Sequence, residues 1–136
     1  HGWSWFVGLA AAPPGERATV ATPHPQLGWE AFPRDHDREA APTTMARVTN
    51  VRYDLRVAQL LVGDDVADGR VVYRRDGLTG NTHRVAEALR PGWTYGWTVR
   101  ARFALDGRDY VTPWTTTFGD DAEAGPGAWY SLTIAP

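Results

Sequence analysis

The sequence predicts an all-β fold, a two-sheet antiparallel β-sandwich with extensions at both termini. Short stretches of alternating apolar and polar residues recur at a spacing of about 8–12 residues, which is typical of sandwich strands. Clusters of Gly, Pro, Asp and Asn separate these stretches and mark turns. The chain has 136 residues, of which 43% are hydrophobic and 22% are charged. This composition is enough for one domain with its own core.

The first half of the chain contains two strand signals separated by a long polar stretch. Leu27 and Trp29 alternate with small or polar neighbours and predict a first sandwich strand. Residues 33–50 are charged and lack apolar periodicity, so they are expected to form a long connection on the surface. Residues 51–57 then alternate strictly between apolar and polar side chains, which predicts the clearest strand of this half.

Turns and short strands are expected between residues 63 and 89. The segment 63–69 is rich in Gly and Asp and predicts a turn, and residues 71–73 predict a short strand. Another turn is bracketed by the pairs Asp76-Gly77 and Gly80-Asn81. Residues 83–89 fit a strand, and a short helix is the alternative because Val-Ala-Glu-Ala-Leu has good helix propensity.

A hairpin dominates the second half. Residues 95–103 alternate as a strand, Asp106-Gly107 is a hairpin turn signal, and residues 110–118 predict the returning strand. Trp129 to Ile134 form a last candidate strand. We therefore divide the chain into an apolar N-terminal extension at 1–17, a sandwich at 18–118 and a C-terminal extension at 119–136 that includes this candidate strand.

The core is expected to form where the apolar positions of these strands face one another between the two sheets. The residues predicted for it are Trp29, Tyr53, Leu55, Val57, Leu89, Trp97, Val99 and Phe103.

One motif resembles a known family. Leu89-Arg90-Pro91-Gly92-Trp93-Thr94-Tyr95 is similar to the corner of fibronectin type III domains, a branch of the immunoglobulin-like sandwiches. The resemblance covers roughly residues 23–118 and rests on the order of the strands as well as on this corner. It implies that Leu89 fills the core, that the Pro-Gly pair turns the chain, and that the Tyr95 hydroxyl bonds back to the main chain. The stretch 33–50 is longer than the family's usual connection.

Composition excludes several classes of protein. A net charge of -2 argues against a nucleic-acid binder, which needs a basic excess. The chain has no Cys, so it offers no disulfide and no thiolate site. No stretch approaches the roughly 20 apolar residues that a membrane-spanning helix needs. All fourteen basic residues are Arg, which is typical of a GC-rich bacterial genome.

From the resemblance and the apolar start we expect an extracytoplasmic protein, in the periplasm, in the outer envelope or secreted. A lipid anchor upstream of His1 is compatible with this location. The sequence alone leaves open whether His1 is the natural mature terminus.

The candidate interaction site is a set of arginines on two neighbouring strands. Arg52, Arg56, Arg100 and Arg102, which we call the arginine face, all point away from the apolar sides of their strands, with Asp54 among them. One interpretation is a solvated face whose charges pair locally. The other is a docking surface for the carboxylates of a protein partner or of a second copy. Exposed Trp93, Trp114 and Trp129 are further candidate contacts.

We therefore predict a non-catalytic interaction or structural module that needs no cofactor. No pattern of paired carboxylates or of Ser, His and Asp indicates catalysis. A first alternative is carbohydrate binding by stacking on Trp93, Trp114 or Trp129. A second alternative is copper binding by the N-terminal His1 together with His24 or His36. Asp35-His36-Asp37 and Asp64-Asp65 are expected to be solvated turns, with metal loops as the alternative.

Overall fold

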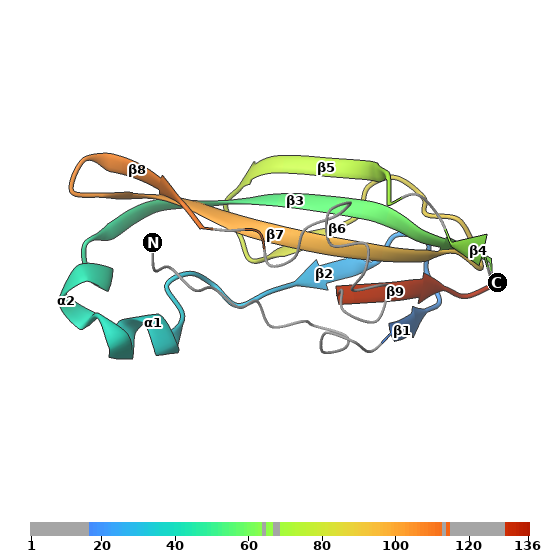
Figure 1. Cartoon of the computed structure of the whole chain (residues 1–136), viewed down its shortest axis with the longest axis horizontal. Coiled ribbons are helices and arrows are strands. Elements are labelled where there is room, and N and C mark those ends of the chain that lie inside the picture. The colour runs from blue at the N-terminus through green and yellow to red at the C-terminus, as the bar shows by residue number, and fades with distance from the viewer. Residues whose placement is uncertain (1–16, 64, 67–68, 113, 115–129) are drawn as a thin grey trace.

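The structure is a computed structural model that describes residues 17–63, 65–66, 69–112, 114 and 130–136 (Figure 1). Within these residues the chain forms nine strands and two short helices, arranged as a seven-stranded sheet and a two-stranded sheet. The fold is therefore mainly β with two sheets, as the alternating segments predict. In this part of the chain, neither helix has the length and apolarity needed to span a membrane.

Two long antiparallel strands, β3 (Val48–Val62) and β7 (Thr94–Leu105), form the centre of the large sheet (Figure 1). Two shorter strands pair antiparallel with β3, namely β4 (Asp65–Val66) and β5 (Val71–Leu78). Two others pair antiparallel with β7, namely β8 (Arg108–Val111) and β9 (Tyr130–Ile134). The last strand, β1 (Arg17–Val20), pairs in parallel with β9. The strands predicted at 51–57 and 95–103 are confirmed and are longer than expected.

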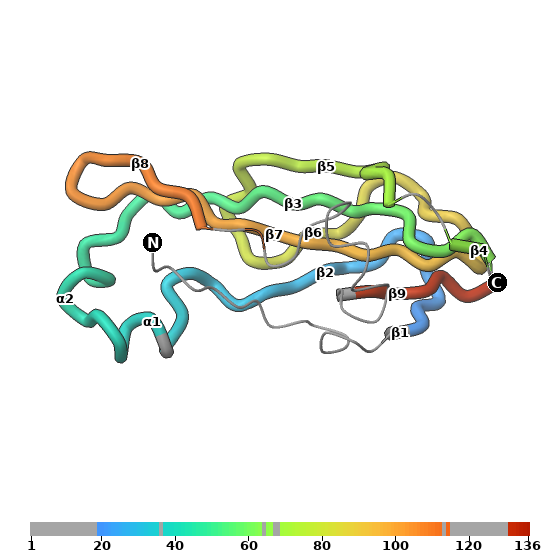
Figure 2. The backbone as a smooth tube through the Cα atoms, in the orientation of Figure 1, coloured from blue at the N-terminus to red at the C-terminus, as the bar shows by residue number. Residues whose placement is uncertain are grey.

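The second layer is small. It consists of β2 (Gln26–Gly28) and β6 (Thr82–Arg84), which pair antiparallel, and it continues into α1 (Asp35–Ala40) and α2 (Pro42–Met45). The tube in Figure 2 shows the two helices at the end of the molecule where the β7–β8 hairpin projects. The small sheet alone would leave this end of the large sheet uncovered, and the helical segment covers it.

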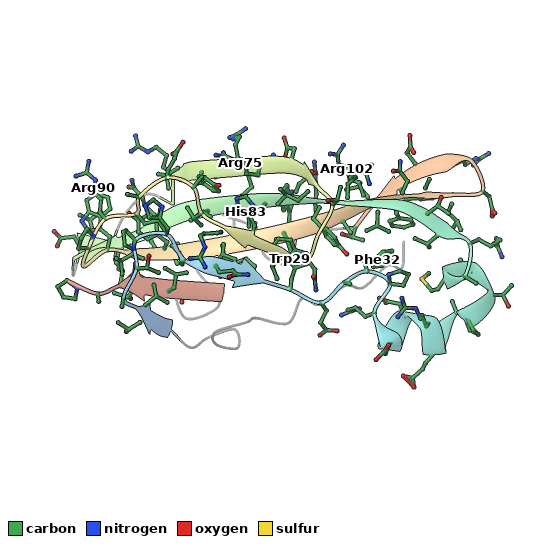
Figure 3. The ribbon with its side chains drawn as sticks, turned by 180° about the vertical axis from the view of Figure 1, so that it is seen from behind. Trp29, Phe32, Arg75, His83, Arg90 and Arg102 are labelled. Atoms are coloured by element: carbon green, nitrogen blue, oxygen red, sulfur yellow. The ribbon has the colours of Figure 1, made fainter. Side chains whose placement is uncertain are left out.

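Every residue predicted for the core is buried in one apolar cluster between the layers. Trp29 lies near its centre, with its ring centroid 5.6 Å from that of Tyr53 and 6.3 Å from that of Trp97. Figure 3 shows Trp29 and Phe32 along the inner side of the second layer. Burial of these large rings between the sheets is the main force that holds the layers together.

The turn before β7 has the hydrogen bond that the corner motif implies. The Tyr95 hydroxyl accepts a hydrogen bond from the backbone N–H of Arg90 at 2.9 Å, and Leu89 is buried. Gly92 has a φ of 78°, a left-handed conformation that suits Gly at this turn. The corner therefore fixes the direction in which the chain enters β7.

The stretch 33–50 lies mostly at the surface, as predicted, but it is more than a connection. It contains α1 and α2 and the first residues of β3, and it contributes Met45 to the core. Phe32, just before it, packs against Phe103 at a ring distance of 4.8 Å. Its apolar residues are too few to show periodicity, but they suffice to cover the end of a sheet. The Asp35-His36-Asp37 part is not a turn, because it begins α1; Asp35 is solvated as expected, whereas Asp37 is buried.

Two predictions for residues 71–89 also need correction. The turn predicted between Asp76 and Asn81 is shorter than expected: Gly80 and Asn81 form a bend, but Asp76 and Gly77 lie inside β5. The register with β3 shifts at this point and forms a bulge at Gly77, whose φ is 72°. A Gly at positive φ serves a turn and a bulge equally well, so the sequence does not distinguish them. Residues 82–84 form a strand, and the helix offered as the alternative for 83–89 does not form.

The hairpin predicted at Asp106-Gly107 is confirmed, with positive φ values of 52° and 78° at the two residues. Its returning strand β8 pairs with the last third of β7, whereas β9 pairs with the first residues of β7 on the same side. The predicted C-terminal strand is thus part of the main sheet. Most of the returning strand predicted at 110–118 lies outside the described residues.

A polar contact joins the two sheets at their edge. Tyr73 of β5 and His83 of β6 are linked by a hydrogen bond of 2.6 Å, and the guanidinium of Arg75 lies 4.2 Å over the Tyr73 ring (Figure 3). Burial of the ring, and then the charge of Arg75, lower the pKa of His83 below 6.5. His83 is therefore mainly neutral near pH 7. The Tyr73 hydroxyl already accepts a hydrogen bond from the backbone N–H of Ala86 at 3.1 Å, which leaves its own hydrogen to donate to Nε2 of His83 in the tautomer that carries the proton on Nδ1.

Candidate functional site

The register of β3 and β7 places the arginine face on one side of the large sheet. Arg52 lies opposite Arg102, Asp54 opposite Arg100, and Arg56 opposite Thr98. Cross-strand partners share a face of the sheet, and every second residue of a strand returns to it. The four arginines predicted from sequence are therefore brought together on the face that points away from the core.

A buried carboxylate lies in the middle of this face. Asp54 is only 1% exposed, and its Oδ2 accepts a hydrogen bond from Nε of Arg100 at 2.9 Å. Its Oδ1 lies 3.0 Å from Nη2 of Arg102 and 3.2 Å from the backbone N–H of Gly77. The bulge in β5 thus supplies a third donor. A carboxylate with three donors, two of them charged, is a strong anchor for the guanidinium groups.

Opposing influences act on the pKa of Asp54. Burial, the largest of them, raises it, but the hydrogen bonds from Arg100 and Gly77 and the charges of Arg102 and Arg100 together lower it below 3.8. The group is therefore ionised at neutral pH despite its burial. It neutralises part of the positive charge and holds the side chains of Arg100 and Arg102 in place.

A second carboxylate and an aromatic ring stabilise the other end of the face. Nη1 of Arg56 lies 2.8 Å from Oδ1 of Asp76. The guanidinium groups of Arg56 and Arg100 also lie 5.2 Å and 4.5 Å from the centroid of the Trp114 ring. Such cation–π contacts limit the movement of both arginines. Asp76 of β5 therefore joins Asp54 as a second acid on this face.

Sequence reasoning missed two members of this site, Arg74 and Asp76, and it did not place the candidate contact Trp114 among the arginines. Arg74 lies directly opposite Arg56 on β5, which adds a fifth arginine beside the arginine face. Asp76 was assigned to a turn, and Trp114 was considered only as an exposed ring. The strand signal at 71–73 hinted at Arg74 and Asp76, but no feature of the sequence gave the register between β5 and β3.

The three candidate tryptophans have different positions. Trp93 is partly exposed, as predicted, and lies between Tyr95, at a ring distance of 6.4 Å, and the guanidinium of Arg90 at 5.0 Å. Figure 3 shows Arg90 at the end of the molecule opposite the helices, far from Arg102. Trp114 belongs to the arginine face, and Trp129 lies outside the described residues. The two described tryptophans of this set, Trp93 and Trp114, therefore belong to different clusters of side chains.

Of the three histidines proposed as copper ligands, His24 is the one whose side chain the structure describes. The Nδ1 of His24 hydrogen-bonds the backbone carbonyl of Val85 at 3.0 Å. His1 and the side chain of His36 lie outside the description, so copper binding stays a prediction. Asp37 pairs with Nε of Arg34 at 3.0 Å. In the described part of the chain, no group of three or more His, Cys, Asp or Glu side chains could hold a metal ion.

Comparisons with known proteins give no further lead. No family model, no curated protein and no solved structure matches the chain. The function is therefore inferred from the geometry of the arginine face.

Proposed function

We propose that this protein is a non-catalytic interaction module of the fibronectin type III-like class, which binds the carboxylates of a protein partner through the arginine face. The two-layer arrangement and the hydrogen bond between Tyr95 and Arg90 support the class. The expected setting is the bacterial envelope or the extracellular space. Fold alone does not assign the function, so the surface has to support it.

The observation on which the proposal rests is an ordered excess of positive charge. The arginine face and Arg74 supply five guanidinium groups, and the carboxylates within ion-pair distance of them in the described residues are Asp54 and Asp76. Asp54, Asp76 and Trp114 hold Arg56, Arg100 and Arg102 in place, so little side-chain entropy is lost when they bind. Preorganised guanidinium groups suit planar carboxylates.

The test has to use arginines that do not support the fold. Reversing Arg56 and Arg100 is the obvious choice from sequence, but these two pair with Asp76 and Asp54. Their reversal would place a carboxylate beside each acid and destabilise the sheet. Arg52 and Arg74 have no acid within ion-pair distance in the described residues, so Arg52→Glu and Arg74→Glu change the charge of the face with little cost to folding.

We expect a capped oligoglutamate peptide to bind weakly, with shifted backbone NMR signals clustered on β3, β5 and β7. Binding should weaken as salt is added, and R52E and R74E should each lower the affinity by about threefold or more. Arg38→Glu is the matched control, because it makes the same charge change on exposed α1, where the Arg38–Asp35 pair at 3.4 Å is open to solvent and contributes little to stability. Signal shifts spread over the whole surface, or an equal loss of affinity in R38E, would contradict the proposal.

A further inference from the structure

A hollow of about 380 Å³ opens at the end of the arginine face nearest the β7–β8 hairpin. Its polar lining consists of Asn50, Arg52, Arg102 and Asp109, and Tyr110 and Val111 of β8 also border it. This volume is at the lower end of the range for ligand sites, and it is large enough for one side chain of a partner. Figure 3 shows Arg102 near the base of the hairpin.

Arg52 and Arg102 converge on this hollow with free donors. They are direct cross-strand partners, so their Cβ atoms are about 4.5–5.5 Å apart and the two guanidinium groups can reach one ligand. Arg102 uses Nη2 on Asp54 and keeps a side chain that is 47% exposed. Arg52 donates from Nη1 to the carbonyl oxygen of Val51 at 3.2 Å. Each guanidinium has five N–H donors, so most of them remain for a ligand.

The apolar residues at the border of the hollow set a second requirement for the group that binds there. Val111 lies opposite Arg102 on the same face of the sheet and is 49% exposed. Tyr110 lies opposite the buried Phe103, stacks on that ring at 5.7 Å and stays 36% exposed at the rim of the hollow. Exposed apolar side chains beside a charged site favour a partner group that is charged at one point and apolar next to it.

Asp109 limits which anions can bind. Asp109 lines the same hollow as the two arginines, and its negative charge repels a second negative charge on the ligand. A single carboxylate can bind Arg52 and Arg102 with its one negative charge turned away from Asp109. A doubly charged phosphate is repelled more strongly, because its second charge also lies near Asp109. The hydrogen-bond acceptors of Asp109 suit the N–H groups of a peptide backbone.

We propose that this hollow is the anchoring subsite for one carboxylate side chain, Asp or Glu, flanked by an apolar residue in a peptide segment of the partner. This inference rests on the proposed function and deepens it. The surface then has two parts. Arg56, Arg74 and Arg100 attract acidic partners by their charge, and the Arg52–Arg102 pair selects the partner that has a carboxylate in the right position. An acidic peptide is favoured over a polyanion because of Asp109.

The probes that test it are the capped tripeptides Leu-Glu-Leu and Leu-Gln-Leu, together with inorganic phosphate, each titrated into the full chain and followed by NMR. We expect Leu-Glu-Leu to shift signals of residues 50–52 and 109–111 and to bind roughly tenfold more tightly than Leu-Gln-Leu. Arg52→Gln should lower the affinity for Leu-Glu-Leu by a similar factor, with Arg38→Gln as the matched control. Asp109→Asn should raise the affinity for phosphate several-fold.

The outcomes separate this inference from the proposed function. If R52Q binds Leu-Glu-Leu as tightly as the unaltered chain while R74E still weakens oligoglutamate binding, the subsite is refuted and the arginine face stands. If neither probe is affected by any arginine substitution, both are refuted. Tighter binding of phosphate than of Leu-Glu-Leu to the unaltered chain would show that the hollow selects for polyanions, and it would overturn the inference.

Discussion

Replacing Asp54 by Asn tests whether this carboxylate organises the arginine face. The substitution keeps the shape of the side chain and removes its charge. One amide oxygen can still accept from the N–H of Gly77 and from Arg102. The amide NH₂ then meets Nε of Arg100, so two donors face each other where a hydrogen bond of 2.9 Å stood.

The expected cost follows from these contacts. A hydrogen bond to a charged group contributes about 1.5–3 kcal/mol, and one such bond is lost outright while another is weakened. The side chains of Arg100 and Arg102 are 31% and 47% exposed, so both can turn toward water and recover part of the loss. We therefore expect D54N to lower the free energy of unfolding by about 1.5–3 kcal/mol at neutral pH.

The pH dependence gives a second signature. The pKa of Asp54 lies below 3.8 in the folded protein. Its contribution to stability is therefore complete well above the unfolded value and is lost as the pH falls below it. The Asn variant has no such titration. The difference between the two proteins should be largest at about pH 7 and should shrink toward about pH 3.

Urea unfolding followed by Trp fluorescence measures the free energy of unfolding of both proteins at each pH. Groups other than Asp54 titrate in both proteins, so their effect cancels when the two free energies are subtracted. A destabilisation below about 0.5 kcal/mol at neutral pH would show that the arginines do not depend on Asp54. A difference that stays constant with pH would show that the loss comes from packing and not from charge.

Three further predictions concern the scaffold. Tyr95→Phe removes the acceptor of the Arg90 N–H and should lower the free energy of unfolding by about 1–2 kcal/mol in urea titrations. Gly96→Ala would place a Cβ 2.8 Å from Cδ1 of Leu60 and should cost about 1–2 kcal/mol, measured the same way. Because the pKa of His83 is lowered below 6.5, the folded protein resists protonation that the unfolded chain accepts. Stability should thus be complete above about pH 6.5 and fall below it, relative to His83→Gln.

Each of these has a result that would refute it. An unchanged unfolding midpoint in Y95F would show that the hydrogen bond between Tyr95 and Arg90 does not stabilise the fold. For Gly96, the double variant with Leu60→Ala should show a coupling energy, and strict additivity would mean that the two residues do not clash. For His83, a stability difference between wild type and variant that stays the same from about pH 7 to about pH 5 would contradict the lowered pKa.

Much of the fold follows from local pattern. Alternation along 51–57 and 95–103 identified the two central strands, and the same alternation divided their side chains into the core set and the arginine face. Burial requires this alternation wherever one side of a strand faces the core and the other does not. The corner from Leu89 to Tyr95 and the hairpin turn at Asp106-Gly107 are equally local, because each needs particular residues at fixed positions.

The other features depend on which segments meet. No property of Asp54 in the sequence distinguishes a buried carboxylate with three donors from a solvated acid, because two of those donors come from β7 and the third from a bulge in β5. Asp76 reaches Arg56 only once the register of β5 on β3 is set. The packing of Phe32 and Met45 over the end of the large sheet also depends on segments that meet only in the folded protein.

The sequence therefore specified the two central strands, their inner and outer faces and the apolar residues that they place in the core. The tertiary structure decided which charges pair, where the helical segment covers the sheet, and how β8 and β9 share one side of β7. The physical reason is that alternation and turn chemistry act between near neighbours along the chain. Ion pairs and the hollow beside Arg52 depend on the register between strands far apart in sequence, which many weak contacts set together.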